Sequence, residues 1–343
     1  MHPIDPNHDL INSASTDESQ SKHAHKGIFY GWYIVAASVA INFYLSIVFF
    51  QGFQVFFLPI LQEFGWTRAL TSGAFSLRQL ESGLLAPIMG FMVDRWGPRI
   101  VILMGVILGG VGMIMLSYVN SLWSFYLAFL LASLGVSGAS HGVSWAVSVA
   151  NWFSRLQGRA LGIAMLGPVI GGPFVVLVAM MDESLGWRTA LFILGIGLWI
   201  VGIPLALVAR SDPYSYGYLP DGDPIDPATD HFMGSLEQES TGFTVQEALK
   251  TRDFWCLLFL FAAFFIGVSG LMVHLIPLLQ DLDYSATEAA GVVGLVFLLS
   301  GIGRVGAGTL ADMIGYRKII LFLIFSELIS LLLLVRIGPS QPW

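Results

Sequence analysis

The fold of this chain is decided by a short stretch, GFMVDRWGPR at residues 90–99, which places charges and glycines in a tight turn between two apolar segments. Each flanking segment approaches or exceeds about 20 residues, the length that an α-helix needs to cross a hydrocarbon core of about 30 Å. The pattern returns as GTLADMIGYRK at residues 308–318, with Gly, Asp, Gly and Arg at the same offsets. This internal repeat predicts two related helical bundles in one chain.

The composition indicates a membrane protein. Of the 343 residues, 55% are hydrophobic and only 11% are charged. Apolar runs of spanning length recur along the chain, and helices satisfy their own backbone polar groups in lipid. We therefore expect an all-α membrane protein with the lipid bilayer as a partner. The formal net charge of −7 is concentrated in polar segments, so a nucleic-acid partner is not expected.

The order of polar and apolar segments predicts four parts. These are a disordered cytoplasmic tail at residues 1–27, a six-helix N-terminal bundle at 28–209, a cytoplasmic linker rich in Pro, Gly and Asp at 210–253, and a partial C-terminal bundle at 254–343. The nine expected spans cover residues 28–58, 69–93, 100–118, 122–152, 160–181, 189–208, 254–279, 286–311 and 318–335. The capping-box spacing TVQE at 244–247 predicts a short helix before the seventh span.

The distribution of Lys and Arg predicts the orientation. With the N-terminus inside, most basic loop residues lie in the cytoplasm, and only Arg68, Arg188 and Arg336 lie outside. Two arginines, Arg78 and Arg304, remain within apolar segments. No nucleotide-binding loop, nucleophile with a matching base, or metal-ligand spacing is seen, so we expect neither an enzyme nor a cofactor.

The two repeated loops and the long linker after the sixth span resemble the major facilitator superfamily. Three further stretches, NWFSRLQGRALG at 151–162, YGYLPDG at 216–222 and HLIP at 274–277, resemble the bacterial monocarboxylate and oxalate/formate porter branch. This resemblance implies a secondary active transporter of small organic anions, mono- or dicarboxylates, in the bacterial inner membrane. Its other partners would be protons or a counter-substrate.

Family members ordinarily carry six plus six helices, whereas this sequence supplies six plus three. The sequence is therefore interpreted either as a fragment or as a truncated product, and a non-transporting relative such as a sensor is the alternative function. Animal monocarboxylate carriers, which the chain also resembles, have a lysine in the first helix where Phe50-Gln51-Gly52 stands. The chain departs from the proton coupling of those carriers at this position, and Gln51 is included among the candidate substrate-binding residues.

Arg304 is the first candidate for binding the substrate carboxylate. It lies within an apolar segment and has no acidic residue three or four positions away. A guanidinium offers a planar fork of donors that matches a carboxylate. The position also matches the helix 8 arginine that the resemblance implies for substrate binding. The alternative is that Arg304 snorkels to the cytoplasmic headgroups.

Arg78 and Glu81 form a second candidate site. Their spacing of three places them on one face of the second span, and an unpaired charge at that depth is costly, so we expect them to pair. The pair would either line and gate the cavity between the bundles or have only a structural role. His274 completes the candidate substrate-binding residues, although a hydrogen-bonded core histidine is the simpler interpretation.

The repeated loops and a Gly-Pro break in the fifth span are the candidate conformational elements. The resemblance implies that the first loop's aspartate braces a positive helix end in the missing part of the family pattern, and that Asp312 meets the region between the fourth and fifth spans. The Gly-Pro break is expected to bend the helix and allow close approach, although packing alone also explains it. The candidates are Gly90, Asp94, Arg95, Gly97, Arg99, Asp312, Gly315, Arg317, Gly167 and Pro168.

Overall fold

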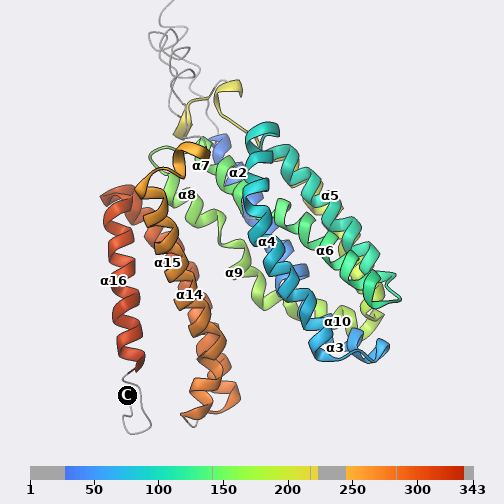
Figure 1. Cartoon of the computed structure of the whole chain (residues 1–343). Helices are drawn as coiled ribbons and strands as arrows, with labels where there is room; N and C mark the ends of the chain where they lie inside the picture. The colour runs from blue at the N-terminus through green and yellow to red at the C-terminus, as the bar shows by residue number, and fades with distance from the viewer. Residues whose placement is uncertain (1–27, 141, 217, 223–244, 283, 336–343) are drawn as a thin grey trace, which may run out of the picture.

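The computed structural model of the chain is helical wherever regular structure is described (Figure 1). The structure describes residues 28–140, 142–216, 218–222, 245–282 and 284–335, without some side chains in α4, α14, α15 and α16. The predicted tail at 1–27 lies outside this part. The all-α prediction is confirmed, and the nine expected spans each correspond to one helix or to a helix interrupted by a break.

The N-terminal bundle contains six spans, three of which are interrupted. Its helices are α2 (Tyr30–Leu45), the π-helical turn η1 (Ser46–Phe50), α3 (Phe53–Phe64), α4 (Arg68–Trp96), α5 (Pro98–Ser117), α6 (Leu122–Ala139), α7 (Val143–Trp152), α8 (Gln157–Ala164), α9 (Gly167–Gly171), the 3-10 turn η2 (Gly172–Phe174), α10 (Val175–Leu185) and α11 (Trp187–Val208). The second bundle contributes α14 (Arg252–Asp281), α15 (Ala286–Ile314) and α16 (Tyr316–Val335).

The segment between the bundles is only partly described. Two 3-10 turns, η3 (Tyr214–Tyr216) and η4 (Pro220–Gly222), belong to a stretch that packs against the N-terminal bundle. The predicted short helix before the seventh span is present as α13 (Val245–Ala248). The end of the molecule that carries this segment and both repeated hairpins is called the linker end below.

Seven stretches among the described residues are long and apolar enough to cross a membrane. They are Tyr30–Phe64, Pro98–Ser117, Leu122–Trp152, Gln157–Leu185, Trp187–Val208, Arg252–Met272 and Gly291–Ile314. The other two long helices, α4 and α16, are not among these stretches; α4 contains Arg78 and Glu81, and α16 contains Glu327. The protein is therefore a multi-pass helical membrane protein.

Aromatic side chains and glycines build the core of the N-terminal bundle. Trp145, Phe53 and Phe129 are among its largest fully buried side chains. Helices α5 and α6 pack through glycines, because a Cβ on Gly135 would overlap the backbone of Gly109. Such small residues allow helix backbones to approach closely in lipid. The third and fourth spans therefore pack through glycine-rich faces.

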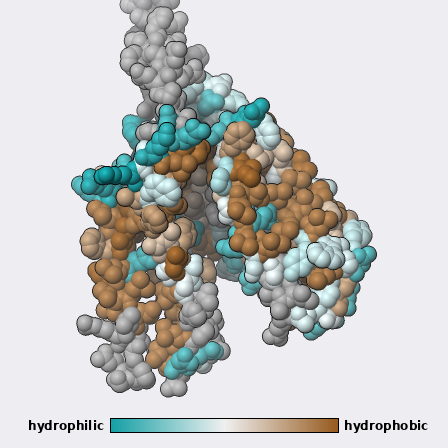
Figure 2. All heavy atoms as spheres, viewed as in Figure 1, coloured by the Kyte–Doolittle hydropathy of each residue, from teal (hydrophilic) through white to brown (hydrophobic). Residues whose placement is uncertain are grey.

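The two bundles meet near the linker end and diverge toward the opposite end (Figure 1). The main contacts between them join α15 to α8, with fewer to α9. The space-filling view shows a hollow between the two bodies that widens away from the linker end (Figure 2). This arrangement places the contact between α8 and α15 at the closed end of the hollow.

Candidate functional site

The backbones of α8 and α15 touch directly at the closed end of the hollow. A Cβ on either Gly158 or Gly308 would overlap the carbonyl of the other residue. One turn further along α8, a Cβ on Gly162 would lie 2.6 Å from the carbonyl oxygen of Arg304. Glycines spaced by four on α8 therefore form the surface that α15 contacts, and the contact closes the linker end of the hollow.

The Asp312 carboxylate bonds across this contact to the start of α8. Its Oδ1 accepts a hydrogen bond from the backbone amide of Gly158 and its Oδ2 accepts one from Arg159, both at 2.7 Å. These amides belong to the first turn of α8, where backbone N–H groups lack helical partners and the helix dipole favours an anion. The contact predicted between Asp312 and the region between the fourth and fifth spans is present.

Arg304 lies on α15 beside a break in the facing helix. Its Nη1 donates a hydrogen bond to the backbone carbonyl of Met165 at 3.2 Å. Met165 follows the last residue of α8, where the helix stops before α9 begins at Gly167. Within the part of the chain that the structure describes, no carboxylate forms an ion pair with Arg304. The guanidinium is thus exposed, without a counter-charge, at the junction of the two bundles.

The breaks in the first and fifth spans meet each other. The Gln51 side-chain amide Nε2 donates to Ser46 Oγ at 2.9 Å and to the Pro168 carbonyl at 3.1 Å. Ser46 Oγ donates to the same carbonyl at 3.2 Å. In this conformation the amide of Gln51 therefore bonds to the two helix breaks.

The close approach predicted at the Gly-Pro break is also present. A Cβ on Gly167 would lie 2.6 Å from the Val39 carbonyl oxygen and 2.7 Å from the Phe43 amide nitrogen. Helix α9 therefore lies directly on the backbone of α2, and Gly167 leaves the space that this packing requires.

The expected ion pair between Arg78 and Glu81 is not formed. The Arg78 guanidinium carbon lies 5.3 Å and 5.7 Å from the ring centres of Phe50 and Phe49. Arg78 Nε and both carboxylate oxygens of Glu81 are buried and lack hydrogen-bond partners of good geometry among the described residues. Glu81 instead has the hydroxyl of Ser133 on α6 as a neighbour. Residues three apart share a helix face but diverge, and here they reach different helices.

The first repeated hairpin has the backbone of the second but lacks its contacts. Gly97 and Gly315 have φ values of 78° and 92°, so both turns use a conformation that favours glycine. Asp94 is exposed and makes no hydrogen bond or ion pair with the described residues. A Cβ on Gly90 would meet no atom within 4 Å. The predicted basic residues Arg95, Arg99 and Arg317 are exposed, and the side chain of His274 lies outside the described residues.

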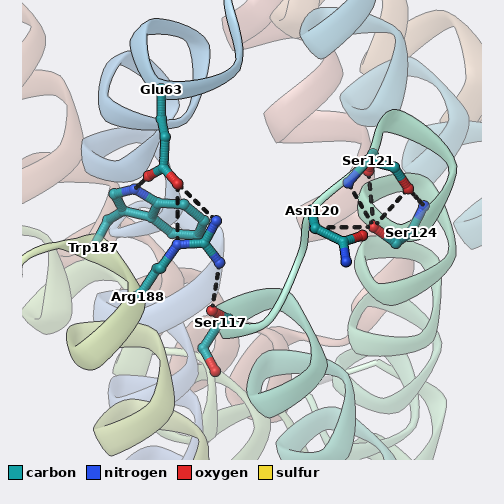
Figure 3. Close-up of polar contacts among 7 residues, drawn as sticks. All are labelled: Glu63, Ser117, Asn120, Ser121, Ser124, Trp187 and Arg188. Carbon is teal, nitrogen blue, oxygen red and sulfur yellow. Dashed lines mark hydrogen bonds and ion pairs between the residues drawn. The ribbon is translucent and has the colours of Figure 1, made fainter.

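A polar cluster at the opposite end was missed by sequence reasoning (Figure 3). Glu63 accepts hydrogen bonds from Trp187 Nε1 at 2.7 Å and from Arg188 Nη2 at 2.7 Å, and Arg188 Nη1 donates to the Ser117 carbonyl at 2.9 Å. The cluster ties α3, α5 and α11 together. Its signal in the sequence was Gly186-Trp-Arg188, which repeats the Gly-x-Arg of both hairpins, and Gly186 has a φ of 77°.

Comparisons with known proteins agree with the architecture. The profile of the Major Facilitator Superfamily matches residues 31–343. The chain is 25% identical over 308 residues to the uncharacterized MFS-type transporter YcxA of Bacillus subtilis (strain 168), covering 84% of this chain and 67% of the relative. It is 26% identical over 289 residues to the oxalate:formate antiporter of Oxalobacter formigenes, covering 84% and 65%. It is 27% identical over 315 residues to monocarboxylate transporter 12 of Rattus norvegicus, covering 82% and 61%.

Proposed function

Because this chain belongs to the major facilitator superfamily, we propose that it is a secondary active transporter of small organic anions, mono- or dicarboxylates, that works by alternating access. The names of two relatives, an oxalate:formate antiporter and a monocarboxylate transporter, support this substrate class. The chain spans about two-thirds of the length of the curated relatives it matches, between 61% and 67% for these three. Transport would be coupled to protons or to exchange with a counter-substrate.

The observation that carries the proposal is the unpaired charge of Arg304. Its guanidinium lies where α15 meets α8, and the hydrogen bond that it donates among the described residues goes to a neutral backbone carbonyl. An ionisable side chain within a membrane-spanning segment is usually paired with another group, and an entering carboxylate would supply that partner. The forked donors of arginine would then hold the anion between the two bundles.

The arrangement of the bundles fits one state of an alternating-access cycle. The molecule is closed at the linker end by α8 and α15 and hollow toward the other end. We propose that the N-terminus and the linker lie in the cytoplasm of a bacterium and that the protein resides in the inner membrane, because Lys and Arg concentrate at that end. The hollow would then face outward.

The orientation is tested by cysteine labelling in intact cells. A single cysteine placed in the linker of a Cys256→Ser variant should react with a membrane-permeant maleimide and resist an impermeant one. Labelling of the linker by the impermeant reagent would overturn this orientation.

The substrate site is tested by replacing Arg304. We expect Arg304→Gln to lose carboxylate binding by the purified protein and uptake by proteoliposomes, at least tenfold, because the charge is removed. Arg304→Lys keeps the charge but loses the forked donors, and we expect it to lose most of the carboxylate binding and most of the uptake as well. Arg252→Gln is the matched control, since Arg252 is an exposed arginine at the start of α14 and is not a candidate site residue.

Two outcomes would contradict the proposal. A fully active Arg304→Lys variant would show that a point charge is enough, as snorkelling predicts. A wild-type protein that closes and opens but neither binds nor transports any carboxylate would favour the alternative, a non-transporting member of the same fold.

A further inference from the structure

The first part of the linker is a folded element that is docked on the N-terminal bundle. The Arg210 carbonyl accepts hydrogen bonds from Ser148 Oγ at 2.9 Å and from Trp152 Nε1 at 3.3 Å. The Arg210 guanidinium lies between the rings of Tyr30 and Tyr216, 4.0 Å and 3.9 Å from their centres. Stacked cations of this kind hold the chain against an aromatic surface. The linker therefore leaves the bundle along a fixed path.

Asp221 ends this docked stretch in a strained conformation. Its φ of 61° makes it the only non-glycine residue with positive φ in the described part of the chain. Its side chain is 4% exposed. Asp is one of the few residues that tolerate this region, and such conformations persist where the surroundings impose them. Asp221 is thus held in place to direct its carboxylate inward.

The Asp221 carboxylate holds the backbone that leads into α8. Its Oδ2 accepts hydrogen bonds from the amides of Ser154 at 3.0 Å and Arg155 at 2.7 Å, and its Oδ1 accepts one from Leu156 at 3.3 Å. Arg155 Nε adds a weak ion pair at 3.8 Å. Three successive amides therefore point at one carboxylate, and α8 begins at the next residue, Gln157.

Two carboxylates from different parts of the molecule thus share one short run of amides. Asp221 binds those of residues 154–156, and Asp312 of α15 binds those of residues 158 and 159. The orientation of the second set depends on the first, because both belong to one continuous run of six residues, 154–159, that leads into α8. The contact made by Asp312 forms between bundles, whereas the contact made by Asp221 lies within the docked linker and N-terminal bundle.

We propose that Asp221 is a positioning residue for the closure of the linker end. By fixing the amides of residues 154–156, it orients those of Gly158 and Arg159 toward Asp312, so that the two bundles close onto a prepared donor pair. The proposal rests on the proposed function insofar as closure is a step of transport. Closure can be measured without any substrate, so a failure of this proposal can be distinguished from a failure of the proposed function.

The proposal is tested with a reporter cysteine at the α8–α15 contact. Val305 is half-buried there, and a Cβ on Gly162 would lie 3.2 Å from its Cα. In a Cys256→Ser background, the maleimide labelling rate of Val305→Cys in detergent reports how often α15 leaves α8. Cys256 is replaced because it is exposed.

We expect Asp221→Asn to raise that labelling rate roughly fivefold, the size typical of coupling within one hydrogen-bond network. Asparagine tolerates the same backbone conformation, so the substitution mainly removes the charge. Asp212→Asn is the matched control, because the Asp212 carboxylate accepts hydrogen bonds from the amide and hydroxyl of Ser215 inside the linker. The control should label at the wild-type rate.

A double substitution distinguishes positioning from simple support of the fold. If Asp221 acts through the donor pair, adding Asp221→Asn to Asp312→Asn should change the rate little. Wild-type labelling by Asp221→Asn, or a full fivefold effect in the Asp312→Asn background, would overturn the proposal.

A second measurement applies even if Asp221 variants fail to fold. Coupling between two sites is reciprocal, so Asp312→Asn alone should speed hydrogen exchange at the amides of residues 154–156, which Asp312 does not touch. Unchanged exchange at these three amides would equally overturn the proposal.

Discussion

The hairpins at residues 90–99 and 308–317 share a sequence pattern and a backbone turn, but among the described residues only the second forms hydrogen bonds between the bundles. Gly97 and Gly315 end α4 and α15 in the same region of φ and ψ. Asp312 holds two amides of α8, whereas Asp94 has no partner among the described residues. The pattern therefore encodes the turn locally, and the helix that faces the turn decides whether its carboxylate closes the molecule.

The largest difference in labelling rate between the two hairpins is expected for Gly308 and its counterpart Gly90. Gly308→Ala should separate α15 from α8, because its Cβ would overlap the backbone of Gly158 and backbone cannot yield as a side chain does. We expect labelling of Val305→Cys to rise more than tenfold. Gly90→Ala and Gly303→Ala place a Cβ in open space and should label as the wild type does. Wild-type labelling of the Gly308→Ala variant would show that α15 and α8 do not pack this closely.

Substitution of either turn glycine should lower the stability of the protein. Gly97→Ala and Gly315→Ala each force a side chain into a glycine conformation, at a cost of about 1–3 kcal/mol in the free energy of unfolding. We expect both to lower the Tm in detergent. Gly97→Ala should lower it further, because its Cβ would lie 2.7 Å from Ser211 Oγ of the docked linker. Gly306→Ala, in open space on α15, provides the control.

Substitution of the two hairpin aspartates should also have different effects on the labelling rate, but the difference should be smaller than for the glycines. Asp312→Asn keeps one acceptor oxygen but loses the charge that the start of α8 favours, worth about 1 kcal/mol. We expect labelling of Val305→Cys to rise roughly fivefold. Asp94→Asn should leave the rate unchanged because its carboxylate makes no hydrogen bond or ion pair with the described residues. Equal effects of the two substitutions would remove the contrast between the hairpins.

The smallest effect on closure is expected at the opposite end. Arg188→Gln removes the ion pair with Glu63, a partly exposed pair worth about 1 kcal/mol or less. The cluster lies within one bundle, so we expect a lower Tm with unchanged labelling of Val305→Cys. A change in labelling would show that this third Gly-x-Arg turn also influences the distance between the bundles.

Helical spans and hairpins were predictable from the sequence because each depends on short-range signals. Apolar length indicated the spans, and glycine at fixed offsets indicated the turns. The contact between Asp312 and the start of α8 was expected from the family resemblance. The side-chain partners of Arg78 and Glu81 were not predictable, because helical spacing fixes a face but does not say which neighbouring helix each side chain reaches. Asp221 was noted only as part of the stretch YGYLPDG, and nothing in the sequence indicated which backbone amides its carboxylate would reach.

The paired breaks in the first and fifth spans have a mechanical consequence. A helix bends most readily where its hydrogen-bond ladder is interrupted, and both spans are interrupted, at η1 and between α8 and α10. Ser46 and Gln51 on one side and Pro168 on the other bond these two joints together. A bend in either span must therefore be shared by the other. The first and fifth spans therefore share one flexible joint, whereas α4, α5 and α11 are continuous helices.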